Sequence, residues 1–479
     1  MRLEKKIAIL TLIVLVACAA VHAQQKDPRV NPPVAPLPPL APNESSSVAD
    51  AKTTSAATPA ATPARPERPA SEIEQVGLGL WGAGQSLFTA NLGVSFTGDS
   101  NASANAGPSQ LRSAVRINGD ASLLRNWRQA TLSMNYSSGG TLYNSGSGLN
   151  RQSHVFGFRY GLVGRGWSLT LNDSFSLLPE SSFGFWSTAG GVLLPGAPGQ
   201  VQSQLNPLLV PNQSILTGIG RRVSNTFAGQ VSYSLTPRSS LAISSSYGIL
   251  RGLNSNLLNN HQWSLGTAYS YLWTSRDSVS LTYSHSGHGW DNSDFGISAD
   301  TLRVGYSRQL TGRLALDVGG GPHISRFRNP VAGSGTRVSS SVRVGLQYQM
   351  SDTHLDVSYM RGITGGSGVL LGAHTDLVQG GMSKRLSRMW TMFVRLGYAR
   401  NVSLFQSTGL TNQYLFKGWH AQTGFSRPVG RYAHMALSYG VNGEQSNSSF
   451  CLGTVCGRSA LRHQFGLSFH FSLPPIALE

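Results

Sequence analysis

The segment from Leu87 to Thr97 reads LFTANLGVSFT, and its side chains alternate between apolar and polar. Phe88, Leu92 and Phe96 fall on one parity, and Thr89 and Ser95 fall on the other. Side chains at a period of two point to opposite faces of a β-strand. The segment therefore predicts a strand with one apolar face and one polar face.

The same alternation recurs along the rest of the chain, notably in 111–120, 130–136, 156–162, 227–235, 241–247, 263–271 and 465–471. Short turns separate pairs of these segments, and they centre near Asn126, Gly164, Pro237, Ser275, Gly312, Asp352, Ser387 and Gly430. Eight such turns interleaved with longer loops predict about 18 strands, within a range of roughly 16 to 18. An even number of strands can close into an up-and-down barrel without a leftover edge.

The composition excludes two broad classes of protein. Only 12% of the 479 residues are charged, which is about half the usual share in soluble globular proteins. No second long apolar run follows the N-terminus, as a bundle of membrane helices would require. The formal net charge of +17 favours anions or acidic surfaces as partners and says nothing about the fold.

The N-terminus has the pattern of a secretory signal. Arg2, Lys5 and Lys6 precede an apolar run over residues 7–20, so we expect residues 1–23 to be a cleaved signal peptide. An uncleaved membrane anchor is one alternative. A second alternative takes residues 15–18 as a lipoprotein box, which would leave Cys18 lipidated.

Residues 24–75 predict a disordered linker, because they hold 11 of the 23 prolines among Ala, Ser and Thr. The segment is either a plain spacer or a docking segment for a partner. Residues 76–479 are then the barrel domain.

Aromatic residues on the apolar parity gather near the predicted strand ends and form two belts, which are typical of a membrane barrel and not of a soluble sandwich. The belts comprise Trp167, Tyr233, Trp273, Trp390 and Phe471 on the short-turn side, and Tyr247, Trp263, Tyr398 and Trp419 on the other. Between the belts we expect no charged residue on the lipid face. The parity places Phe88, Val115, Leu265, Val344 and Leu467 toward lipid, and Thr89, Arg116, Gly266, Arg343 and Ser468 inward.

Over residues 76–479 the chain resembles the Gram-negative outer-membrane β-barrel proteins of the porin-like superfamily. The last strand, 461–471, carries their alternating pattern and terminal aromatic, although residues 472–479 follow it. The resemblance implies an outer-membrane location, with membrane lipid, the barrel-assembly machinery and small solutes as partners. It is compatible with a homotrimer and implies no nucleic acid and no cofactor.

The polar parity predicts a basic inner wall. The charged residues on it are Arg112, Arg116, Asp120, Arg159, Arg303, Asp317, Arg337, Arg343, Asp356 and Arg395. Such a lining attracts anions and repels cations. The alternative is that these side chains pair across the lumen and close it.

The third long loop, about 178–225, is the longest and is our candidate constriction, since the corresponding loop of trimeric porins folds into the channel. Its candidate residues are Glu180, Phe183, Phe185, Trp186, Arg221 and Arg222. The alternative is an exposed loop that binds a partner.

Two smaller patterns concern disulfide and metal chemistry. Cys451 and Cys456 share the last long loop in an oxidising compartment, so we expect a disulfide. His285, His288 and Asp291 have spacings that could suit a metal, but we expect no metal site, because loop histidines are common.

The leading functional hypothesis is a porin-like channel for small anionic or neutral polar solutes. A barrel for surface display or export is the alternative. An outer-membrane hydrolase or acyltransferase is a third class, for which a Ser/His/acid cluster on the outer rim would be the sign. We expect no enzyme activity.

Overall fold

The computed structural model describes the barrel domain in twelve ranges, which are 86–101, 111–144, 151–179, 221–253, 259–291, 296–329, 333–364, 372–404, 415–447, 451–452, 455–456 and 459–478. The expected signal peptide and linker lie outside the described residues. Within these ranges there is no helix of the length and hydropathy that crossing a bilayer requires.

The secondary structure consists of strands. Their bounds are β1 Ser86–Asp99, β2 Arg112–Asn126, β3 Ala130–Tyr143, β4 Arg151–Val163, β5 Trp167–Pro179, β6 Arg221–Thr236, β7 Ser239–Gly252, β8 Asn260–Leu272, β9 Asp277–Trp290, β10 Gly296–Thr311, β11 Leu314–Asn329, β12 Gly333–Gln349, β13 Thr353–Thr364, β14 Ala373–Arg385, β15 Thr391–Ser403, β16 Leu415–Val429, β17 Ala433–Ser446, β18 Cys451–Leu452, β19 Val455–Cys456, β20 Ser459–Ser472 and β21 Ile476–Leu478.

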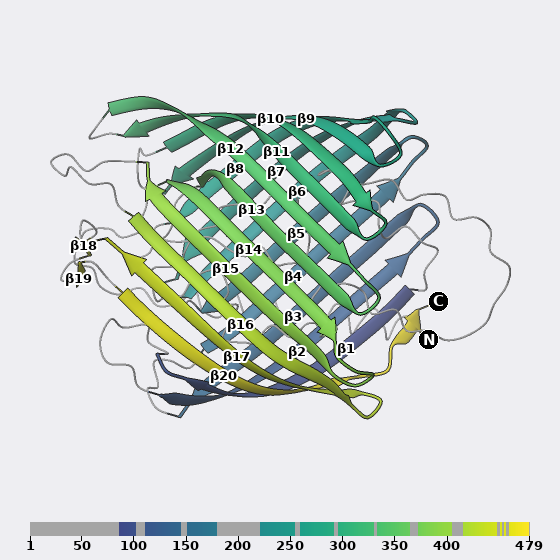
Figure 1. Ribbon diagram of the computed structural model, residues 1–479, viewed down its shortest axis with the longest axis vertical. Coiled ribbons are helices and arrows are strands. Elements are labelled where there is room, and N and C mark those ends of the chain that lie inside the picture. Colours follow the sequence, from purple (N-terminus) through teal and green to yellow (C-terminus); the bar gives the residue numbers. More distant parts are fainter. Residues whose placement is uncertain are drawn as a thin grey trace, which may run out of the picture. The chain divides into compact units, whose positions relative to one another are not determined.

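Strands β1 to β17 and β20 form one closed antiparallel barrel (Figure 1). Each strand pairs with its neighbours in sequence, and β1 pairs with both β2 and β20, which closes the ring. The predicted all-β, up-and-down barrel of 18 strands is confirmed. The hairpin β18–β19 is a separate two-stranded sheet.

The eight predicted short turns all join consecutive strands of the barrel. In several of them a hydroxyl side chain accepts hydrogen bonds from backbone N–H groups two and three residues later. Thr274 Oγ1 accepts from Arg276 N at 3.1 Å and Asp277 N at 3.0 Å, and Thr311 Oγ1 accepts from Arg313 N at 3.2 Å and Leu314 N at 3.1 Å. This local bonding explains why Ser or Thr recurs at these turns.

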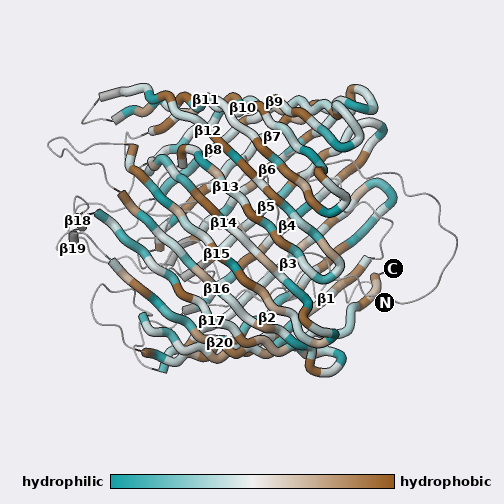
Figure 2. The backbone as a smooth tube through the Cα atoms, viewed as in Figure 1, coloured by the Kyte–Doolittle hydropathy of each residue, from teal (hydrophilic) through white to brown (hydrophobic). Residues whose placement is uncertain are grey.

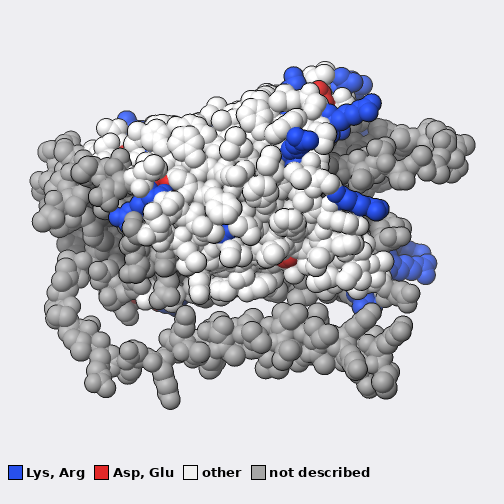
Figure 3. Space-filling view, turned by 90° about the horizontal axis from the view of Figure 1, so that it is seen from below, with Lys and Arg blue, Asp and Glu red and all other residues white. Residues whose placement is uncertain are grey.

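The outer face of the barrel is an apolar belt. Leu265 is 51% exposed whereas its neighbour Gly266 is buried, and the same contrast repeats along most strands. Figure 2 shows the alternating hydropathy, and Figure 3 shows Lys and Arg gathered toward the two ends of the described barrel. All nine aromatic residues expected in the two belts are exposed, which fits contact with lipid instead of a second sheet.

Two belt tryptophans lie over glycines of the next strand. A Cβ atom added at Gly287 would come within 2.5 Å of Trp263 Nε1, and one added at Gly443 would collide with Trp419 Nε1 in the same way. The register pairs each tryptophan with that glycine. A larger residue at either position would lift the indole off the sheet.

The expectation of an uncharged lipid face between the belts is wrong at Asp173. This residue is in the middle of β5 and pairs with Phe158 and Phe227, and Phe227 is 47% exposed. Asn225 Nδ2 donates a hydrogen bond to Asp173 Oδ1 at 3.0 Å. An amide from the neighbouring strand therefore partly satisfies a carboxyl group that the alternation alone would not place there.

The residues after β20 extend the barrel wall. Following Ser472, the strand β21 pairs with the first residues of β1, with Phe88 opposite Ile476 and Ser86 opposite Leu478. The tail that departs from the usual ending of outer-membrane barrels thus covers the edge of β1 that β20 leaves unpaired.

Candidate functional site: the inner wall

The inner wall is formed by the side chains on the parity opposite to the apolar belt. Arg116 stands between the exposed Val115 and Ile117, and Arg303 stands between the exposed Leu302 and Val304. The same reasoning places all ten predicted charged residues on the inner face, which are Arg112, Arg116, Asp120, Arg159, Arg303, Asp317, Arg337, Arg343, Asp356 and Arg395. Their role in conduction stays a prediction.

One basic group lies on β2 and β4. Asn118 Nδ2 donates to Asp120 Oδ2 at 3.1 Å, and Arg116 stands one inward position farther toward the long-loop end of β2. Arg159 faces inward from β4, and no carboxylate of the described chain forms an ion pair with it. This wall therefore carries more positive than negative charge.

A second basic group lies on β10 to β12. Arg303 Nη2 donates to Ser341 Oγ at 2.8 Å, and Arg343 Nε lies 3.8 Å from Asp317 Oδ1. Ser307 Oγ also donates to Asp317 at 2.8 Å. Arg337 stands on the same inner face of β12 as Arg343. The Ser341 hydroxyl therefore holds Arg303, and the Asp317 carboxylate lies beside Arg343.

A third group lies farther along the same side, on β13 and β15. Asp356 faces inward beside His354, with His354 Nε2 3.8 Å from Asp356 Oδ1. Arg395 is only 5% exposed. In a ring of 18 strands β3 and β12 are nine strands apart, so the arginines of β2 and β4 stand across the barrel from those of β10 and β12.

The inner-face charges that the sequence reasoning did not name include Asp99, Arg462 and Glu444. Asp99 and Arg462 form a buried ion pair between β1 and β20, and Glu444 is 4% exposed on β17. With them, the inner-face residues named here comprise eight arginines and five carboxylates. The same period of two places all three inward, because each lies on the inner parity of its strand.

The candidate constriction falls mostly outside the described residues. Glu180, Phe183, Phe185 and Trp186 lie in the segment 180–220, which is not described. Arg221 and Arg222 belong to β6 and pair with Pro179 and Leu178. We expected the loop to span 178–225, but residues 178–179 belong to β5 and residues 221–225 belong to β6.

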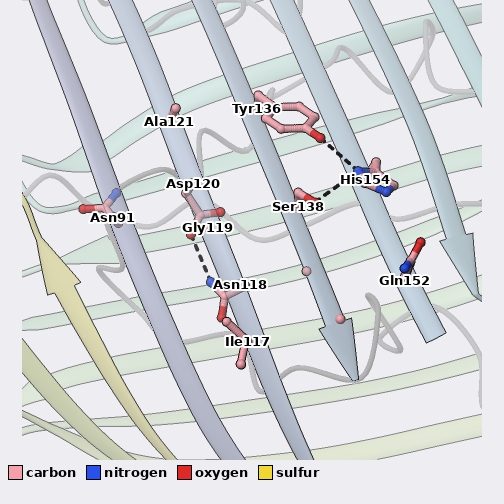
Figure 4. A pocket seen from close by; sticks show the side chains of 12 residues that line it. Asn91, Ile117, Asn118, Gly119, Asp120, Ala121, Tyr136, Ser138, Gln152 and His154 are labelled. Atoms are coloured by element: carbon pink, nitrogen blue, oxygen red, sulfur yellow. Dashed lines mark hydrogen bonds between the residues drawn. The ribbon is translucent and has the colours of Figure 1, made fainter. Parts of the chain in front are cut away.

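The outer wall has a hollow of about 640 Å³ at the long-loop end of β2 to β4 (Figure 4). His154 Nδ1 lies 2.9 Å from Tyr136 Oη and 3.1 Å from Ser138 Oγ. This is a Ser/His pair on the lipid side, the kind of sign that an outer-membrane hydrolase would give.

The rest of the hollow does not extend that pair to a catalytic triad. The carboxylate among the described lining residues is Asp120, whose side chain belongs to the inner face. A second outward pair, Tyr439 Oη to His463 Nδ1 at 2.8 Å, repeats the tyrosine–histidine contact with similar ring stacking. We interpret both pairs as a way to satisfy a histidine near the lipid boundary.

The three residues with metal-like spacing do not converge. His285 faces outward and its Nδ1 lies 2.7 Å from Asp300 Oδ1, whereas His288 faces inward. Asp291 forms ion pairs with Arg251 and His261. Within the described ranges no three metal-ligating side chains gather.

The two loop cysteines are opposite each other in the hairpin β18–β19, where Cys451 pairs with Cys456 and Leu452 with Val455. The disulfide itself stays a prediction.

No protein-family profile matches the sequence, and no curated protein sequence matches it. Among solved structures, Pseudomonas aeruginosa OccK2 (OpdF) in complex with glucuronate is 11% identical with a TM-score of 0.44, covering 81% of this chain and 98% of that one. Pseudomonas aeruginosa OpdK with vanillate is 13% identical with a TM-score of 0.41 over 81% and 99%. Acinetobacter baumannii OccAB4 is 7% identical with a TM-score of 0.43 over 82% and 99%. Similarity this low does not identify a solute for this chain. The solute class is inferred below from the side chains of its inner wall.

Proposed function

We propose that this barrel is a channel of the bacterial outer membrane for small anionic or neutral polar solutes. The observation that carries the proposal is the contrast between the two faces of one closed sheet. The outer face is an apolar belt between two rings of aromatic side chains, and the inner face carries arginines, serines, asparagines and glutamines.

The width of the barrel supports passage of solutes. Side chains alone fill barrels of about 8 strands, whereas those of about 16 to 18 leave an aqueous channel. The inner faces of β7 and β8 carry Ser244, Ser246, Gln262 and Ser270 and no charged residue. This wall offers hydrogen bonds to hydroxyl groups of a neutral solute.

The arrangement of charge supports a preference for anions. Arginines face the lumen from β2 and β4 and, across the barrel, from β10 and β12, so an anion between the walls is attracted from both sides. A guanidinium group binds carboxylate or phosphate in a forked geometry. Carboxylated or phosphorylated small molecules are therefore the solute class that fits, and the chain would catalyse no reaction on them.

Surface display or export is the competing function. It predicts a lumen without ion flow, whereas the channel predicts conductance after insertion of purified full-length protein into a planar bilayer. Liposome swelling extends the test to solutes. Proteoliposomes should swell faster in a small sugar acid than in an amino sugar of the same size. Equal rates or no swelling would contradict the proposal.

The remaining partners follow from the proposed location. We expect the barrel-assembly machinery to insert the chain through its last strands, and a homotrimer is compatible with the apolar outer wall. Crosslinking of intact cells followed by size analysis would distinguish a trimer from a monomer.

A further inference from the structure

A basic cluster lies on the outer wall of β13 to β16 at the long-loop end, and no solute path explains it. We call Tyr359, Arg361, Asp376, Arg400 and Lys417 the rim cluster. Asp376 is at its centre: it accepts a hydrogen bond from Tyr359 Oη at 3.0 Å and lies 3.7 Å from Arg361 Nε and 3.5 Å from Arg400 Nη1. Two arginines contact this carboxylate, and Lys417 is opposite Arg400 on the next strand.

The register shows that the cluster faces lipid and not the lumen. Arg361 is opposite Asp376, Asp376 is opposite Arg400, and Arg400 is opposite Lys417, so all four share one face of the sheet. The exposed belt residues Val378 and Tyr398 lie on this face too. The side chains of Arg361 and Arg400 are 42% and 45% exposed, whereas Asp376 is 17% exposed. The carboxylate is covered and the guanidinium groups are open.

A second group on β9 to β11 repeats this layout. Asp300 accepts a hydrogen bond from Tyr283 Oη at 2.8 Å and lies 2.7 Å from His285 Nδ1 and 3.4 Å from Arg326 Nη1. In both groups a tyrosine is two residues before a basic residue on one strand, and an aspartate is opposite that basic residue on the next. An arrangement that occurs twice toward the long-loop end is unlike a scattered surface ion pair.

The rim cluster begins where the aromatic belt ends. Arg361 follows Tyr359, Arg400 follows Tyr398, and Lys417 precedes Trp419, in each case by two residues toward the long-loop end. Two residues along a strand are about 6 to 7 Å. Since belt aromatics sit at the headgroup level, these cations stand at or just beyond it. The long loops of bacterial barrels are extracellular, so this is the outer leaflet.

We propose that the rim cluster binds the phosphate group of an outer-leaflet lipid with a phosphorylated sugar headgroup. The two guanidinium groups, the ammonium group of Lys417 and the single covered carboxylate together carry an excess of two positive charges, which suits a phosphate monoester. Asp376 acts as a positioning residue that keeps the two arginine side chains at one spot. The inference rests on the proposed membrane location, but not on conductance.

The test is native mass spectrometry of the full-length protein in detergent with a bis-phosphorylated diglucosamine lipid, alongside the same lipid without phosphates. The wild-type protein should retain the phosphorylated lipid. The variant Arg361→Gln/Arg400→Gln/Lys417→Gln should bind it about tenfold or more weakly, because hydrogen bonds to charged groups are lost. Retention should fall as salt rises.

The matched control is Arg125→Gln/Arg427→Gln/Arg431→Gln, which removes three positive charges at the short-turn rim and should keep wild-type retention. Equal retention by wild-type and rim-cluster variants, or equal retention of the phosphate-free lipid, would overturn the proposal. Complete displacement by about 10 mM inorganic phosphate would assign the cluster to free anions and also overturn it. If the triple variant does not fold, Arg400→Gln and Arg400→Lys replace it, and the lysine should restore part of the retention.

A failure here is distinguishable from a failure of the proposed channel. The rim cluster faces lipid, so its variants should keep the conductance of the wild-type protein. A loss of lipid binding without a change in ion flow would show that the two surfaces act separately.

Discussion

Arg462 and Asp99 join the last strand of the barrel to the first. Arg462 Nε lies 2.9 Å from Asp99 Oδ1 and 3.1 Å from Asp99 Oδ2, and the side chains are 3% and 1% exposed. Tyr143 Oη donates to Asp99 Oδ2 at 3.3 Å, and Asn101 N donates to Asp99 Oδ1 at 3.1 Å. The pair therefore ties β1, β20 and the end of β3 together at the long-loop end of the seam.

Breaking this pair should weaken closure of the barrel. Asp99→Asn removes the charge of the carboxylate that faces this buried guanidinium group, and breaking a buried ion pair costs about 3 to 5 kcal/mol. We expect a lower urea midpoint for unfolding in detergent and loss of heat-resistant mobility on gels. Asp317→Asn is the control, since Asp317 is 27% exposed and its loss should cost less. An Asp99→Asn protein with the wild-type midpoint would show that backbone pairing alone holds the seam.

The β21 strand should contribute to the same seam at its short-turn end. Deleting residues 473–479 leaves Ser86, Leu87 and Phe88 without their partners on that side. Because only three pairs are lost, we expect the barrel to form with a modestly lower unfolding midpoint and faster amide hydrogen exchange at the start of β1. Unchanged exchange there would contradict the assigned pairing.

Removal of residues 24–75 should leave the barrel intact. The segment is rich in proline and poor in apolar residues, so it has little to add to the fold. We expect the deletion protein to insert and conduct like the full chain, and limited proteolysis to cut this segment first. Failure of the deletion protein to assemble would show that the segment does more than space the barrel.

Cys451 and Cys456 should form a disulfide across β18 and β19. Directly opposed residues of an antiparallel pair have Cα atoms about 4.5 to 5.5 Å apart, within the range that a disulfide spans. Under denaturing conditions without reductant we expect no thiol labelling at either position, and a mass lower by two hydrogens. Because the hairpin is outside the main sheet, Cys451→Ser/Cys456→Ser should keep the barrel's unfolding midpoint. Labelling of both thiols would sink the prediction.

The two-residue period of apolar and polar side chains was sufficient to predict most of the fold. Alternation of apolar and polar side chains, with Ser or Thr at the short turns, predicted the number of strands, the position of each turn and the two aromatic belts. These are local properties of the chain. The inner-face placement of residues such as Arg116 and Arg343 follows from the same alternation, because the parity of a strand determines the face of every side chain on it.

What the sequence did not reveal depends on contacts between side chains on different strands. Asp99 and Arg462 are 363 positions apart, and the alternation that puts each on the inner face does not show that they pair. Asp173 breaks the alternation because it is a charged residue on the lipid face. Its hydrogen bond comes from Asn225 on the next strand, a contact that the alternation does not predict. The rim cluster was missed for the same reason, since Arg361, Asp376 and Arg400 belong to three strands and meet only through the register.

The zero-current potential of the channel in a salt gradient tests the central claim most directly. The account predicts that the full-length protein conducts and that its potential favours anions, more at about 0.1 M salt than at about 1 M, since the Debye length falls from about 10 Å to about 3 Å. Arg112→Gln/Arg116→Gln/Arg343→Gln should shift the potential toward cations, while Arg125→Gln/Arg427→Gln/Arg431→Gln at the short-turn rim should not. No conductance, or a cation preference in the wild-type protein, would contradict the account.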